Sequence, residues 1–244
     1  MKANKIGEKN KIIVQLVLKG LRGFREVIPD VFREFINEEE YKVLREDVLE
    51  PLRLGFSITD EGIHNGKPSM STSRIWQLVL WCLLYPGEHY LRIDAININK
   101  GNVTIMWHLI ALEYSSNKNV IFDMVKKLSK TQFLRFILTV LLGDGDVTFE
   151  RRNVYVRPIV RLSVGINEFK EWSDVLNRLK NLEINWKQTN AKGEIQIQIR
   201  GKNAIKLARI IINAIPSLMI VLFDVLEVLG FDKWNRLKSV AGMR

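Results

Sequence analysis

The segment TQFLRFILTVLLGDG, residues 131–145, limits most strongly what this chain can fold into. It predicts a helix that is apolar on nearly every side and that ends at a glycine turn. Such a helix has no face suited to water, so it has to be buried on all sides. The rest of the chain must therefore supply layers that surround this helix.

The residues that follow this helix predict a regular order of strands and helices. The predicted elements are a strand pair at 147–165, an amphipathic helix at 168–182, a second strand pair at 184–190 and 193–201, and a closing helix at 201–215. Asn190, Ala191, Lys192 and Gly193 predict the hairpin turn inside the second strand pair. Residues 131–215 thus predict an α+β fold of order αββαββα with an antiparallel sheet.

A shorter version of the same order precedes this half. Residues 72–130 predict αββα, and WCLLYPGE at 81–88 aligns with TVLLGDGD at 139–146. We interpret 72–130 as a degenerate half that lacks the second strand pair and the last helix, although two buried helices ending in glycine turns also arise by chance. We expect residues 1–71 to form a helical N-terminal extension with a turn-rich loop at 59–71, and residues 216–244 to form a C-terminal helix.

The charge of the chain favours a polyanionic partner. Lys and Arg together number 37 against 27 acidic residues, which gives a net charge of +10. Residues 131–215 carry 14 basic and 8 acidic residues, whereas residues 27–64 carry 4 basic and 10 acidic residues. The single cysteine, Cys82, excludes an intrachain disulfide and a zinc site built from cysteines, so we expect a cytoplasmic location.

One stretch has the length of a membrane span. Residues 210–230 are largely apolar but include Asn213, Pro216, Asp224 and Glu227. Carboxylates in the middle of a bilayer each cost about 2.5–3.5 kcal/mol. We therefore expect a buried helix pair broken at Pro216, and no membrane partner.

Residues Ile137 to Gly145, with the strands that follow them, resemble the LAGLIDADG homing endonuclease family. The sequence departs from the family pattern in three ways. Leu138 and Thr139 stand where the family prefers small residues that let two such helices pack closely, and Leu142 replaces the first motif acid. In the 72–130 block, Pro86 stands where the motif carboxylate would be.

The resemblance implies a catalytic role for Asp144. In the family, two buried helices pack side by side and each brings one carboxylate to the centre, where Mg²⁺ activates water and stabilises the leaving oxygen of a phosphodiester. The resemblance implies Asp144 as the metal ligand, and Asp146 and Glu88 are further candidate ligands. The alternative is a simple helix-ending turn, in which Gly145 is left-handed and Asp144 is merely exposed.

The predicted sheet offers a polar face suited to nucleic acid. GEIQIQIRG alternates strictly, so that its isoleucines share one face and its polar residues share the other. Arginine recognises guanine and glutamine recognises adenine in the major groove, each through two hydrogen bonds. The candidate face consists of Arg157, Arg161, Ser163, Lys187, Thr189, Gln196, Gln198 and Arg200, and Arg151 and Arg152 are candidate phosphate contacts. An ordinary solvated face is the alternative.

The sequence therefore predicts a sequence-specific binder of double-stranded DNA with Mg²⁺-dependent phosphodiester cleavage. Because only Asp144 is available as a motif acid, we expect cleavage to be reduced to nicking or lost, in a monomeric pseudo-dimer rather than a homodimer. The alternative is a cleavage-inactive DNA- or RNA-binding relative, such as a regulator or an intron-splicing helper. A third class is a partner-binding protein that uses the acidic N-terminal helices.

Overall fold

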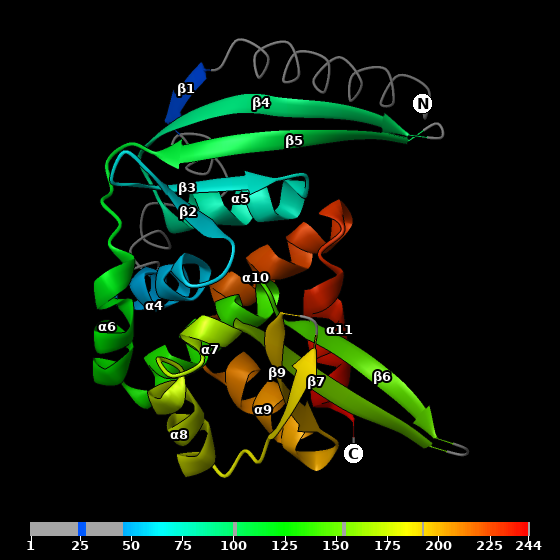
Figure 1. Cartoon of the computed structure of the whole chain (residues 1–244). Helices are drawn as coiled ribbons and strands as arrows, with labels where there is room; N and C mark the ends of the chain where they lie inside the picture. The colour runs from blue at the N-terminus through cyan, green and yellow to red at the C-terminus, as the bar shows by residue number, and fades with distance from the viewer. Residues whose placement is uncertain (1–23, 28–45, 100–101, 153–154, 192, 244) are drawn as a thin grey trace. The chain divides into compact units, whose positions relative to one another are not determined.

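The computed structural model describes residues 24–27, 46–99, 102–152, 155–191 and 193–243. These residues fall into two compact units (Figure 1). The first unit contains the described residues 24–27 and 61–116, and the second contains 46–60 and 117–243. The fold is α+β with antiparallel sheets, as the sequence predicts.

The first unit is built around one antiparallel sheet. Its elements are β1 (Phe24–Val27), β2 (Glu61–His64), β3 (Lys67–Thr72), α5 (Ile75–Leu84), β4 (Glu88–Asn99) and β5 (Asn102–Ala111), and the strand order is β1-β4-β5-β3-β2. The helix α5 is buried along most of its length, because Trp76, Leu80, Trp81 and Leu84 all lie in the core.

The second unit combines a sheet with most of the helices described. Its elements are α4 (Glu46–Ser57), η1 (Lys118–Val120), α6 (Ile121–Lys127), α7 (Lys130–Leu142), β6 (Asp146–Arg152), β7 (Tyr155–Gly165), η2 (Ile166–Glu168), α8 (Ser173–Asn181), β8 (Lys187–Ala191), β9 (Glu194–Arg200), α9 (Lys202–Asn213), α10 (Ser217–Leu226), η3 (Glu227–Leu229) and α11 (Asp232–Gly242). The sheet order is β6-β7-β9-β8.

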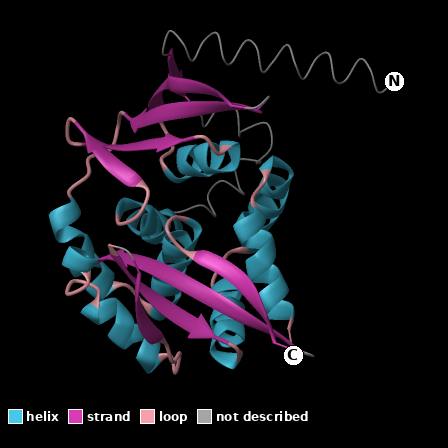
Figure 2. Ribbon diagram, turned by 45° about the vertical axis from the view of Figure 1, so that its right-hand side comes forward, coloured by secondary structure: helices cyan, strands magenta, loops and turns pink. Residues whose placement is uncertain are grey.

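The half at 131–215 forms as the sequence predicts. Ser129 and Gln132 form a capping box that starts α7, and the residues from Phe136 to Leu142 are all buried. One face of the sheet packs on α7, α9 and α11, and no helix of the described residues covers its other face in Figure 2. Ile197 and Ile199 are fully buried on the covered face, so the alternation of β9 sets which face is polar.

The other half begins earlier than the sequence analysis places it. The order α4, β2, β3, α5, β4, β5, α6 repeats the order α7, β6, β7, α8, β8, β9, α9. The strands β2-β3-β5-β4 are arranged in the first sheet as β6-β7-β9-β8 are in the second. The block at 72–130 is therefore the larger part of a complete αββαββα half that starts at α4, rather than a degenerate αββα half.

The expected loop at 59–71 is instead a hairpin. The strands β2 and β3 pair antiparallel, from Glu61 with Met70 to His64 with Lys67. Asn65 and Gly66 connect them with φ angles of 50° and 75°, which is the backbone of a tight hairpin turn. The dipeptide Asn-Gly is the strongest short-range hairpin signal, so this pair could have been predicted from the sequence.

The chain after residue 213 also differs from the single C-terminal helix expected. The helix α9 ends at Asn213 and α10 begins at Ser217, so the expected break at Pro216 is confirmed. Gly230, with a φ of 87°, separates α10 and η3 from α11. Within the part of the chain that the structure describes, no single helix is long and apolar enough to cross a bilayer; Lys202–Asn213 and Ser217–Leu229 pass that test only together, bent by 111°.

Candidate active site and nucleic-acid interface

The candidate site lies at one end of two packed helices, α4 and α7. No other helix contacts α7 as extensively as α4 does among the described residues. A Cβ atom built on Gly55 of α4 would lie 2.1 Å from Thr139 Oγ1 and 2.5 Å from the carbonyl oxygen of Phe136. Only glycine fits there, so the two backbones approach as closely as helices can.

The C-terminal ends of the two helices also meet. A Cβ atom on Gly143 would lie 2.3 Å from Thr59 Oγ1 and 3.0 Å from Asp60 Oδ2. The Thr59 hydroxyl is held by donating to the carbonyl oxygen of Gly55 at 3.0 Å. The half-buried Asp60 carboxylate therefore lies against the turn that carries Asp144.

The structure aligns Asp60 with Asp144, which corrects the expectation that Pro86 stands at the position of the second motif acid. The pairs Gly55 and Thr139, Thr59 and Gly143, and Asp60 and Asp144 are each 84 residues apart, so the structure aligns α4 with α7. Pro86 lies instead in the turn after α5, where its carbonyl oxygen accepts a hydrogen bond from Tyr114 at 2.9 Å. The alignment of α4 with α7 also explains the large residue Thr139, because the small residue of that pair, Gly55, is on the partner helix.

Asp144 is exposed at the end of α7, in an electrostatically mixed environment. Partial desolvation raises the pKa of its carboxyl, the nearby Lys233 lowers it, Glu194 raises it and Lys118 lowers it. Two ammonium groups therefore act on this carboxylate. Desolvation is nevertheless the largest influence, so the pKa of the Asp144 carboxyl is raised overall.

The alternative of a simple helix-ending turn differs from the structure at Gly145, although Asp144 is exposed as that alternative expects. Gly145 does not have a positive φ angle, so it is not a left-handed cap. A Cβ atom on Gly145 would lie 2.6 Å from both Cα and the carbonyl oxygen of Leu141. Glycine is needed at 145 because the chain folds back tightly onto α7, and this places Asp144 at the tip of the turn.

Of the two further candidate ligands, Asp146 is engaged in an ion pair and Glu88 belongs to the other unit. Asp146 forms an ion pair with Arg161 at 2.8 Å and lies 4.0 Å from Arg236. Glu88 lies in β4, in the first unit, whereas Asp144 is in the second. Among the described residues, no group of three or more His, Cys, Asp or Glu side chains is arranged to hold a metal. Two carboxylates nevertheless fit Mg²⁺, which protein sites commonly hold through one or two carboxylates together with waters and substrate phosphates.

The polar face of the second sheet brings the predicted binding residues into rows. In one row Lys187, Gln198, Arg161 and Asp146 are register partners across the four strands. The next row contains Thr189, Gln196 and Ser163. The structure thus places these predicted residues on one surface, because antiparallel partners point to the same side of a sheet.

Hydrogen bonds order this face in the free protein. The Gln198 amide donates to Thr189 Oγ1 at 2.9 Å, and Arg200 Nε donates to Gln198 Oε1 at 3.0 Å. Arg161 donates to Thr148 Oγ1 at 2.9 Å as well as to Asp146. Gln198 is only 8% exposed, so its role in recognition requires that it exchange one of these bonds for a base edge.

Arg151, one of the two arginines proposed as phosphate contacts, is an exposed residue of β6. Its register partner is Val156, and successive strand residues alternate between faces. Arg151 is therefore on the face of the sheet opposite to that of Arg157. The side chain of Arg152 lies outside the described part of the structure.

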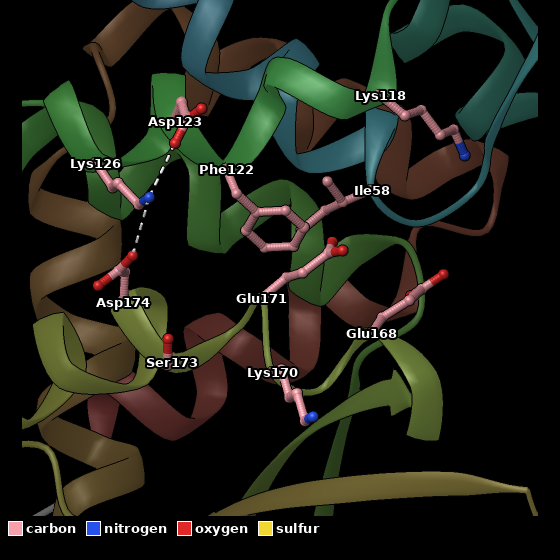
Figure 3. A pocket seen from close by; sticks show the side chains of 10 residues that line it. All are labelled: Ile58, Lys118, Phe122, Asp123, Lys126, Glu168, Lys170, Glu171, Ser173 and Asp174. Carbon is pink, nitrogen blue, oxygen red and sulfur yellow. Dashed lines mark hydrogen bonds and ion pairs between the residues drawn. The ribbon is translucent and has the colours of Figure 1, made fainter.

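A hollow of about 520 Å³ lies between α6 and the segment from η2 to α8 (Figure 3). Its lining residues are Ile58, Lys118, Phe122, Asp123, Lys126, Glu168, Lys170, Glu171, Ser173 and Asp174. Lys126 is paired with Asp123 at 2.9 Å and with Asp174 at 3.6 Å. The charges are nearly balanced, so this hollow does not select anions.

No protein-family model and no curated protein matches the chain. Several solved structures do match the chain. The homing endonuclease I-WcaI bound to its DNA recognition sequence is 15% identical, with a TM-score of 0.49 over 71% of this chain and 84% of that one.

Mesophilic variants of the homing endonuclease I-DmoI are 14% identical, with a TM-score of 0.40 over 72% of this chain and 97% of that one. The LAGLIDADG homing endonuclease I-GzeII in complex with its DNA target is 10% identical, with a TM-score of 0.39 over 79% and 90%. These solved homing endonucleases are proteins that the chain is similar to.

Proposed function

We propose that this protein is a Mg²⁺-dependent endonuclease that recognises double-stranded DNA. The observation that carries the proposal is the contact of Gly143 with Thr59 and Asp60, which puts a second carboxylate beside the Asp144 turn. One acid from each of two packed helices is what cleavage of both strands requires. Because each of the two helices carries an acid, we propose double-strand cleavage rather than the nicking that the sequence analysis expected.

Different residues of this chain would hold the metal ion and offset the charge of the phosphate. Asp60 and Asp144 would hold Mg²⁺, which in such sites lowers the pKa of a bound water and stabilises the leaving oxygen. Lys118 places positive charge near Asp144, where it offsets the charge of the scissile phosphate. The close contact of α4 with α7 keeps the two acids at a constant separation.

The open face of the second sheet would bind the DNA. Arg161, Lys187 and Arg200 supply positive charge, and the glutamines supply paired donors and acceptors for base edges. The net charge of +10 adds long-range attraction to a polyanion. RNA offers the same phosphate chemistry, so an RNA-binding relative without cleavage is the competing outcome.

The test is a cleavage selection from a randomised duplex library, with and without Mg²⁺. Asp60→Asn and Asp144→Asn should each reduce cleavage by more than about 100-fold, since even residues outside the ligand shell of a metal site cost 10–100-fold. Asp146→Asn is the matched control, because Asp146 is paired with Arg161, and it should retain cleavage. Tight, salt-sensitive duplex binding without cutting by the wild type would establish the binding-only alternative, and binding to structured RNA alone would establish the splicing-type relative.

We further propose that the active form is a monomer. Both helices that bring the acids together belong to one chain, so a second copy is not required to complete the site. Light scattering on the complex with DNA should give one protein of 28.4 kDa per duplex. Two copies per duplex, with cleavage that is second order in protein, would contradict this proposal.

A further inference from the structure

The lysine Lys233 reaches the candidate site from outside the two αββαββα halves. It lies at the start of α11, and its Nζ donates to the carbonyl oxygen of Leu142 at 2.9 Å and to that of Gly143. Carbonyl groups at a helix C-terminus have no partner within the helix, and they form the negative end of its dipole. The lysine ammonium donates hydrogen bonds to these carbonyl groups and also places a positive charge at the negative end of the helix dipole.

The helix that carries Lys233 is firmly attached to its unit. Trp234 is fully buried, its Nε1 donates to Asp224 Oδ1 at 2.8 Å, and its ring packs against Phe223 at 5.0 Å. From α9, Arg209 Nε donates to the carbonyl oxygen of Ala241 at 2.8 Å. The ammonium of Lys233 therefore extends from a fixed base.

The same helix also contacts the far side of the turn. Arg236 Nη1 donates to the carbonyl oxygen of Val147 at 3.4 Å, and it lies 4.0 Å from Asp146. Gly143 and Gly145 have no side chains that could anchor the turn between these points. The Asp144 turn is thus held by α11 on both sides, and Lys233 makes the closer contacts.

We propose that Lys233 is a positioning residue, which holds the turn at residues 143–145 so that Asp144 stays beside Asp60. This inference rests on the proposed function, since it assigns Lys233 to the carboxylate site. Loss of the ammonium would leave two carbonyl oxygens without their donor at the point where the two carboxylates approach. The turn would then sample other conformations, and the acids would less often be placed for one metal ion.

The test compares Lys233→Met and Lys233→Arg with Lys238→Met. Lys238 lies on the same helix and pairs with Asp224 and Glu227, so its replacement removes the same charge away from the turn. Amide hydrogen exchange in peptides that span residues 141–147 should become roughly tenfold faster in Lys233→Met, because hydrogen bonds from a charged donor are worth that factor or more. Lys233→Arg should recover most of the protection, and Lys238→Met should match the wild type.

A second readout addresses the metal. The Mg²⁺ concentration for half-maximal cleavage, and the Ca²⁺ concentration for half-maximal binding to the protein–DNA complex, should both rise roughly tenfold in Lys233→Met at an unchanged duplex affinity. If the wild type binds no divalent ion and cuts no duplex, the proposed function fails, and hydrogen exchange still decides the positioning role. Unchanged exchange at 141–147 in Lys233→Met, or unchanged metal dependence in an active enzyme, would overturn the inference.

Discussion

Replacing Gly55 by alanine should destabilise the protein, although alanine is the better helix former. A Cβ atom at residue 55 would stand 2.1 Å from Thr139 Oγ1 and 2.5 Å from the carbonyl oxygen of Phe136. Ordinary contacts at such a site are about 3.4 Å or longer, so α4 and α7 would have to separate. Overpacking of this kind costs about 1–3 kcal/mol, and the gain in helix propensity offsets at most about 1 kcal/mol.

The measurement is the midpoint of thermal unfolding by calorimetry. With a mid-range overpacking cost of about 2 kcal/mol, the net loss is about 1–2 kcal/mol. For a chain of this size, 1 kcal/mol corresponds to about 2–4 °C, so Gly55→Ala should lower the midpoint by roughly 2–8 °C. Gly242→Ala is the matched control, because Gly242 is also near the end of a helix and a Cβ atom there would meet nothing within 4 Å. Its midpoint should stay the same or rise slightly.

The double replacement of Gly55 and Thr139 by alanine separates the two contacts. It removes the clash with Thr139 Oγ1 but leaves the clashes with the Phe136 carbonyl oxygen and with the Cβ atom of residue 139, so it should recover only part of the loss. Cleavage should decrease in parallel with the midpoint, because the same contact positions Asp60 and Asp144. An increase in the midpoint of Gly55→Ala, like that of the control, would refute the close packing of α4 on α7.

Three further predictions follow from single side chains. Burial lowers the pKa of His89 from 6.5 to about 4, so the unfolded chain takes up a proton first as the pH falls; unfolding by urea should show a loss of about 3 kcal/mol between pH 6.5 and pH 4 that His89→Phe removes. Arg178 donates to the carbonyl oxygens of Val125 and Leu128, both at 2.6 Å, so Arg178→Met should cost about 2 kcal/mol in the same assay and Arg178→Lys should recover little of it. Arg200→Ala should relax base preference at one position of a selected duplex, without flattening the salt dependence by more than about one unit per lost phosphate contact.

The sequence predicts the half at 131–215 well because its signals are local. In β9, Ile195, Ile197 and Ile199 alternate with polar residues, so strand, face and partner follow from a period of two. The capping box of Ser129 and Gln132 marks the start of α7 in the same local way. None of these signals depends on what another part of the chain does.

The start of the first half depends on a tertiary contact that local patterns do not report. Pro51 ends or kinks a helix in a local analysis, yet α4 continues through it to Ser57. The N–H that proline lacks would have bonded the carbonyl oxygen of Asp47, four residues earlier. Arg135 of α7 donates to that oxygen instead, at 3.2 Å, so the partner helix offsets the local penalty.

The second acid was missed for a related reason. Close packing of two helices limits the combined size of the residues that meet, and not the size of each residue alone. Thr139 is too large for a contact between two identical helices, but it fits against Gly55 because glycine leaves the space. A motif assessed on α7 alone therefore appears degraded, whereas the two helices together meet the packing requirement. The same reasoning identifies Asp60, because the residue five positions after Gly55 stands where Asp144 stands after Thr139.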